Sequence, residues 1–217
     1  MSGKISVTKL VVVPAVATLA VTLLRVTGEL LHWSRTLFNP TPGGGGAIVG
    51  IVWLIPVFGV YFALRLAKLG EAPERPGRAI GYAALGFAIL AAGFLMFQYA
   101  FQSLHGLVVR WGTAALGGML PRYGWRGLYK VLIAYAYLAR IPVAIVMLLA
   151  TLGAWESHYS ALAFPTTRMS PLAQYFLLGF FPQLVWWVGL TLTVGVLVGS
   201  VAAAIALQVK SRKPMAA

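Results

Sequence analysis

A row of polar and charged residues crosses an otherwise apolar stretch near the N-terminus. Its members lie three or four residues apart: Thr18, Thr22, Arg25, Glu29, His32 and Thr36. This spacing predicts that they share one face of an α-helix. Charged groups facing lipid would be costly, so the row is expected to face protein or water. Arg25 and Glu29 lie four residues apart and can form an ion pair, either as a structural lock or as part of a binding site.

A second arginine, Arg140, lies about halfway along the apolar stretch 130–153, and Tyr137 lies one turn before it. The chain has four acidic residues, and Glu29 is the one inside an apolar stretch. We therefore expect Arg25 and Arg140 to share Glu29, which leaves positive charge uncompensated. Such a guanidinium can bind a carboxylate, a phosphate or a lipid headgroup. Backbone carbonyls or snorkelling are the alternative way to satisfy it.

Gln98, Gln102 and His105 form a second row with helical spacing, at the end of the apolar stretch 79–101. They either mark the point where a helix leaves the membrane or line a polar path through it. On the second interpretation Gln98 and Gln102 join Arg25, Glu29, Arg140 and Tyr137 as ligand-binding candidates.

The three histidines offer a different chemistry. If His32, His105 and His158 lie at the same membrane surface, they can converge with Glu156, which stands two residues before His158. Three imidazoles and a carboxylate suit zinc or another divalent metal. The spacings carry no metal-site signature, and axial haem ligation by His32 and His105 is a further alternative.

These residues must be positioned by helices in a membrane. Hydrophobic residues make up 60% of the 217-residue chain and charged residues 10%, against about 25% charged in a soluble domain. The apolar stretches are continuous, which excludes the alternating pattern of a β-barrel. The net charge of +13 arises mostly from Lys and Arg flanking these stretches, so nucleic-acid binding is not expected. The absence of cysteine excludes disulfides, thiolate metal sites and Cys nucleophiles.

We predict an all-α, polytopic membrane protein with six transmembrane spans, five being the alternative, in a single domain over residues 1–217. An interfacial or re-entrant segment containing Pro171 and Pro182 is expected before the last span. The fourth span is short and contains Arg110. With six spans, twelve of the seventeen basic residues lie on the cytoplasmic side, as the positive-inside rule requires. With five spans, the excess of basic residues on that side nearly disappears. The predicted spans are 8–34 (uncleaved), 47–68, 79–101, 104–120, 130–153 and 183–208.

The leading functional hypothesis is binding or transport of a small or amphiphilic anion through a polar site inside the bundle. A metal-dependent membrane enzyme with its site at the outer face is one alternative, and a non-catalytic accessory subunit of a membrane complex is another. The expected partners are the bilayer, an anionic lipid or solute, and a second copy or other subunits. The expected location is a bacterial inner membrane, with both termini cytoplasmic.

Overall fold

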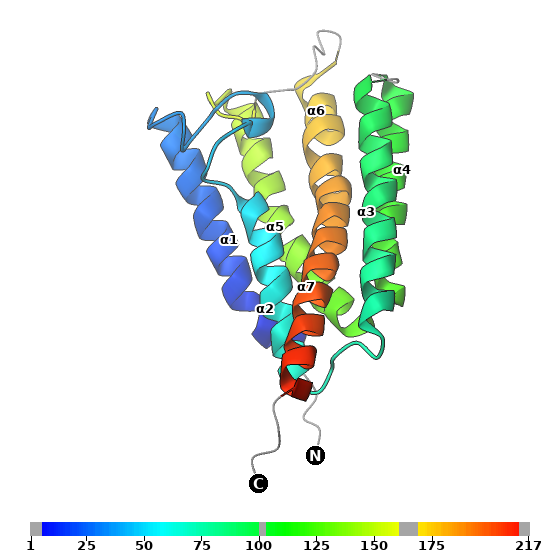
Figure 1. Cartoon of the computed structure of the whole chain (residues 1–217). Coiled ribbons are helices and arrows are strands. Elements are labelled where there is room, and N and C mark those ends of the chain that lie inside the picture. Colours follow the sequence, from blue (N-terminus) through cyan, green and yellow to red (C-terminus); the bar gives the residue numbers. More distant parts are fainter. Residues whose placement is uncertain (1–5, 100–102, 161–168, 213–217) are drawn as a thin grey trace.

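The computed structural model describes residues 6–99, 103–160 and 169–212 as a bundle of helices, without a strand in those ranges (Figure 1). Five helical segments are long and apolar enough to cross a membrane, as predicted for an all-α membrane protein. The main helices are α1 (Val7–Leu30), α2 (Leu54–Lys68), α3 (Pro76–Tyr99), α4 (Leu104–Met119), α5 (Arg126–Leu152), α6 (Pro171–Gln174) and α7 (Trp187–Arg212).

The first helix ends earlier than the predicted span 8–34. Ser6 caps its N-terminus by accepting a hydrogen bond from the backbone N–H of Lys9 at 3.4 Å. At the other end Leu31 is the C-cap, and His32 adopts a left-handed backbone with φ of 52°. The polar row therefore remains on one helix face only as far as Glu29, because the chain turns away before His32.

Helix α4 is not among the five long apolar segments. It has 16 residues, and a 3₁₀ turn over Leu120–Tyr123 extends it. It runs beside α3 in the opposite direction, so the described chain traverses the bundle six times, and the start of α1 and the end of α7 lie at the same end (Figure 1). Gly86 of α3 and Gly117 of α4 allow this close pairing, because a Cβ on either residue would meet the backbone carbonyl oxygen of the other. The predicted stretch 104–120 is thus a member of the bundle.

The last apolar stretch forms one continuous helix and not a separate interfacial or re-entrant segment followed by a span. Its first part, α6, leads through two π-helical stretches, Tyr175–Phe180 and Pro182–Trp186, into α7. Proline removes a backbone donor, and π-turns accommodate such interruptions without ending the helix. Pro182 therefore marks a widened helix at the place where the sequence suggested a break.

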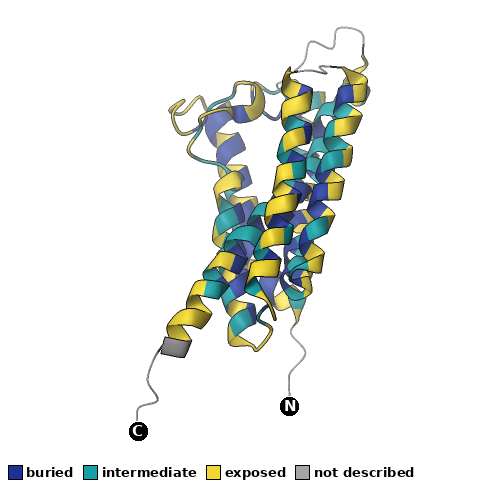
Figure 2. Ribbon diagram, turned by 45° about the vertical axis from the view of Figure 1, so that its right-hand side comes forward, coloured by how far each residue is buried: buried dark blue, intermediate teal, exposed yellow. Residues whose placement is uncertain are grey.

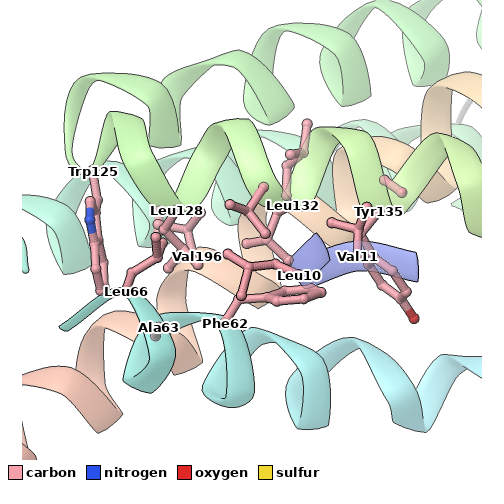
Figure 3. Close-up of a cluster of buried hydrophobic side chains, with 14 of the residues drawn as sticks. Leu10, Val11, Phe62, Ala63, Leu66, Trp125, Leu128, Leu132, Tyr135 and Val196 are labelled. Carbon is pink, nitrogen blue, oxygen red and sulfur yellow. The ribbon is translucent and has the colours of Figure 1, made fainter. Parts of the chain in front are cut away.

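Apolar side chains pack most densely in the half of the bundle nearer the termini. Figure 3 shows Phe62 of α2 lying among Leu128, Leu132 and Tyr135 of α5, with residues of α1 and α7 closing the cluster. Gly59 of α2 sits against α7, where an added Cβ would lie 2.7 Å from the Gly195 carbonyl oxygen. Small residues at such a contact allow two helices to approach closely.

The outward faces are apolar as well. In Figure 2 exposed residues run along the outer sides of the helices, and buried residues gather between them. Val13 and Leu85 are two of many large apolar side chains that remain exposed. A surface of this kind is suited to lipid, in agreement with the predicted bilayer environment.

Candidate functional site

Glu29 is the centre of a buried polar network that joins α1 to the segment after α5. Its carboxylate accepts from Nε of Arg25 at 2.9 Å and from the backbone N–H of His158 at 3.0 Å. The Nδ1 of His158 lies 2.6 and 2.8 Å from the two carboxylate oxygens, so this nitrogen carries the proton and donates. Glu29 is 1% exposed and is therefore fully engaged by groups of the chain itself.

The glycine-rich loop completes the surroundings of Arg25. Its Nη2 donates to the carbonyl oxygens of Gly44 at 3.1 Å and Asn39 at 3.4 Å. Gly44 has φ of 60°, and a Cβ there would collide with the guanidinium. Gly44, one of four consecutive glycines, thus allows close backbone approach to a buried cation.

His158 lies outside the membrane-spanning segments, in the turns that follow α5. Burial lowers the pKa of its imidazole from the ordinary 6.5, the hydrogen bond to Glu29 opposes this, and the positive charge of Arg25 adds to it. Its ring packs on that of Tyr159 with centroids 3.9 Å apart. Burial also raises the pKa of the Tyr159 phenol. Both side chains are thus kept uncharged near neutral pH.

Arg140 lies in a different environment and does not share Glu29. It is 3% exposed, and its Nη1 donates to Oε1 of Gln183 at 3.4 Å. Its guanidinium carbon stands 4.6 Å above the Trp187 ring. The close contacts between a basic and an acidic side chain found among the described residues, Arg25–Glu29, His32–Glu156 and His158–Glu29, do not include Arg140. The expected sharing fails because Arg25 and His158 already occupy Glu29.

The structure places several predicted ligand-binding residues away from Arg140. Tyr137 is 40% exposed on the outer side of α5, whereas Tyr135 points inward and its hydroxyl lies 2.9 Å from that of Thr18. Gln98 is exposed near the end of α3. Gln102 lies outside the described residues.

Sequence reasoning missed the two partners of Arg140. Gln183 is an isolated amide in an apolar stretch and follows a proline, which is a signal that could have been used. Trp187 carried no such signal, because tryptophan is common at membrane surfaces and in apolar cores.

The four predicted metal ligands do not come together. Nε2 of His32 lies 3.9 Å from Oε2 of Glu156, but the two side chains are 71% and 83% exposed. His158 is turned toward Glu29, and His105 begins α4 on the other side of the bundle from α1 (Figure 1). Within residues 6–99, 103–160 and 169–212 no group of three His, Cys, Asp or Glu could hold a metal ion. The same separation of His32 from His105 argues against a haem held between these two residues.

Arg110 of α4 also lies among aromatic rings inside the bundle. Its guanidinium carbon lies about equally far from three aromatic rings, those of Phe94, Phe97 and Trp186, at 5.0, 5.3 and 4.9 Å. Trp186 in turn packs edge-on against Trp187 with centroids 4.8 Å apart. Two arginines therefore flank a pair of tryptophans where the π-helical stretch joins α7. Arg110 is only half-buried, so it differs from Arg140 in its access to the surface.

Comparison with known proteins adds no relative. Searches against protein-family models, curated proteins and solved structures each found no match to this chain.

Proposed function

We propose that this membrane protein binds an amphiphilic anion, meaning a carboxylate or phosphate on an apolar tail, and that Arg140 is its anchor. The binding position lies between α5 and the π-helical stretch Pro182–Trp186. The observation that carries the proposal is a fully buried guanidinium with one long hydrogen bond to a neutral amide and no ion pair among the described residues.

Charge balance favours a ligand at this position. Removing a cation from water is costly unless an anion and good hydrogen bonds compensate it. Arg25 has this compensation from Glu29 and two carbonyl oxygens. Arg140 has Gln183 and the face of Trp187, and a cation–π contact contributes about 2 kcal/mol or more when desolvated. This leaves donors of the guanidinium fork for an external carboxylate or phosphate.

The neighbours of Arg140 favour an anion with an apolar tail over a small hydrated ion. The Gln183 amide contacts Met147 at 3.5 Å, and Val143 of α5 is buried beside the same face. Tyr175 donates to the Ala144 carbonyl oxygen at 3.1 Å, which occupies its polar end. A small anion would lose its hydration shell here for a single cation, whereas each buried methylene of a tail contributes about 0.8 kcal/mol.

The network around Glu29 then has a supporting role. It ties α1, the glycine-rich loop and the segment after α5 together near one end of the bundle. Because the Glu29 carboxylate is occupied by Arg25 and His158, the network holds the end of α5 in place, and thereby Arg140, without touching the ligand. Transport of the bound anion across the membrane would be a further step of the same proposal.

A thermal-unfolding series tests the proposal. In an uncharged detergent, oleate and dodecyl phosphate should raise the Tm of the wild-type protein with increasing concentration, because they bind the folded state, and dodecanol should not. Arg140→Met should abolish this rise. Without anion, Arg140→Met should melt at or above the wild-type temperature, since it removes an uncompensated buried charge.

Arg110→Met is the matched control. It removes the same charge from a helix of the same bundle and should keep the rise with both anions. An equal loss of the rise in both variants would contradict the assignment to Arg140. No anion-dependent rise in the wild-type protein would favour the accessory-subunit hypothesis.

A further inference from the structure

The end of the molecule that carries both termini has two adjoining hollows, which are separate from Arg140. The connection between α2 and α3 and the turn between α4 and α5 form the walls of the first hollow, and the same turn and the start of α5 form those of the second. Their volumes are about 350 and 470 Å³, and they share Arg122, Tyr123 and Arg126. Basic side chains from both connections line them: Arg75, Arg78, Arg122, Arg126 and Lys130.

These cations are not neutralised by neighbouring acids. Glu71 and Glu74 also line the first hollow, and the ion pairs of the described residues include neither of them. A Cβ on Gly127 would lie 3.0 Å from Oε2 of Glu71, so this carboxylate stands at the first turn of α5. At this position its negative charge interacts favourably with the positive end of the α5 helix dipole. Five cations against two acids leave the hollows positively charged.

The walls are well fixed, which distinguishes this place from a set of loose surface charges. Trp125 is 4% exposed, and its indole N–H donates to the Glu71 carbonyl oxygen at 3.0 Å. At Gly124 an added Cβ would lie 2.6 Å from the Cα of Ala79, so the turn between α4 and α5 touches the backbone of the first turn of α3. The Arg122 guanidinium donates to the Tyr123 hydroxyl at 2.7 Å and lies over the same ring.

We propose that these hollows bind the phosphate headgroup of an anionic phospholipid. Basic pockets between helices at a membrane surface attract anionic headgroups, and aromatic rings such as Tyr123 and Tyr82 suit the same depth. The bias that orients membrane proteins accounts for basic residues at this end, but it does not require them to converge on a shared hollow. Arg65 and Lys68 of α2 show the difference, since both are exposed near this end and line neither hollow.

The experiment compares lipids and soluble phosphates on the full-length protein. Thermal unfolding and native mass spectrometry are performed with phosphatidylglycerol, phosphatidylcholine and glycerol 3-phosphate added to the purified protein in uncharged detergent. Phosphatidylglycerol should raise the Tm and stay bound, and phosphatidylcholine should do neither. Stabilisation by glycerol 3-phosphate equal to that by phosphatidylglycerol would overturn the lipid assignment in favour of a soluble phosphate.

Variants locate the effect. The double substitution Arg122→Gln/Arg126→Gln should weaken phosphatidylglycerol binding by about fivefold for each cation removed. Arg65→Gln/Lys68→Gln, which removes the same charge outside the hollows, should keep wild-type binding. If the double variant does not fold, Arg75→Gln replaces it. Arg75 is an exposed loop residue, and its substitution should also weaken phosphatidylglycerol binding. Equal losses in the hollow and control variants would overturn the proposal, because they would show a diffuse surface attraction. The oleate response at Arg140 should be unchanged in all of them.

Discussion

Glu29 is the residue on which the internal charge balance of the described structure depends. Its carboxylate holds Arg25 and His158 together, and its side chain is inaccessible to water. Glu29→Gln should destabilise the fold by about 3–5 kcal/mol, because it leaves a buried guanidinium without its counter-ion. The measurement is thermal unfolding in uncharged detergent.

Two companion variants sharpen this test. Glu156→Gln removes an acid that is 83% exposed and should leave the Tm almost unchanged. Adding Arg25→Met to Glu29→Gln should recover much of the lost stability, since the unpaired charge is removed too. No recovery would mean that Arg25 acts mainly through its contacts with the glycine-rich loop.

The lowered pKa of His158 predicts a pH dependence with a definite sign. Its pKa in the folded protein lies below the ordinary 6.5, so the unfolded chain takes up the proton first as the pH falls. The contribution of this residue to stability is therefore fully present above about pH 6.5 and decreases as the pH falls below it. The measurement is the Tm between pH 8 and pH 5.

His158→Asn should flatten this dependence, because an amide can still donate to Glu29 but does not titrate. His32→Asn is the control, since that imidazole is largely exposed, and it should keep the wild-type slope. A Tm that rises on acidification in the wild-type protein would contradict the assigned direction.

At the residue scale the sequence predicted the buried face of α1 well and the partners of α5 poorly. Helical spacing was sufficient to place Thr18, Thr22, Arg25 and Glu29 together, and all four are buried. The pairing of Glu29 with His158 joins residues 129 positions apart, and no local pattern encodes such a contact. For the same reason the count of acids could not show which arginine would remain unpaired.

The glycine-rich loop shows how an element positions a charge. Gly44 needs its left-handed backbone and has no room for a side chain beside Arg25, whereas Gly45 has φ of −56° and no atom within 4 Å of an added Cβ. Gly44→Ala should therefore cost roughly 1–3 kcal/mol, and Gly45→Ala should have little effect. Comparing the Tm of these two neighbouring variants measures the difference, and equal effects would show that the loop does not hold Arg25.

Hydropathy was a good guide to the elements and a poor guide to their ends. The apolar stretches located each helix, because lipid requires every backbone group to be paired inside a helix. However, α2 begins at Leu54 and not at 47, and the last helical segment begins at Pro171 and not at 183. The early end of α1 arises from the positive φ of His32, a residue type that only occasionally adopts this conformation. The π-helical course of Tyr175–Trp186 was not predicted, because proline and long apolar runs signal a break as readily as a widened turn.

For the whole molecule, six traverses place the start of α1 and the end of α7 at one end (Figure 1). The positive-inside rule predicts that this end, which carries the basic hollows, faces the cytoplasm. A reporter fused after Lys213 should therefore read as cytoplasmic, and one inserted between Gly45 and Gly46 should read as external. Opposite readings would invert the orientation, and a C-terminus external to a cytoplasmic N-terminus would contradict the six traverses.

The central claim concerns the place where α5 meets the last helix, and binding of a labelled anion tests it most directly. Radiolabelled oleate is equilibrated with the purified protein in nanodiscs of uncharged lipid, together with the Arg140→Met and Arg110→Met variants. Saturable binding near one equivalent is predicted for the wild-type protein and for Arg110→Met, with at least a roughly tenfold weaker affinity in a folded Arg140→Met protein. Equal binding by all three proteins, or none by the wild type, would contradict the claim that Arg140 anchors an amphiphilic anion.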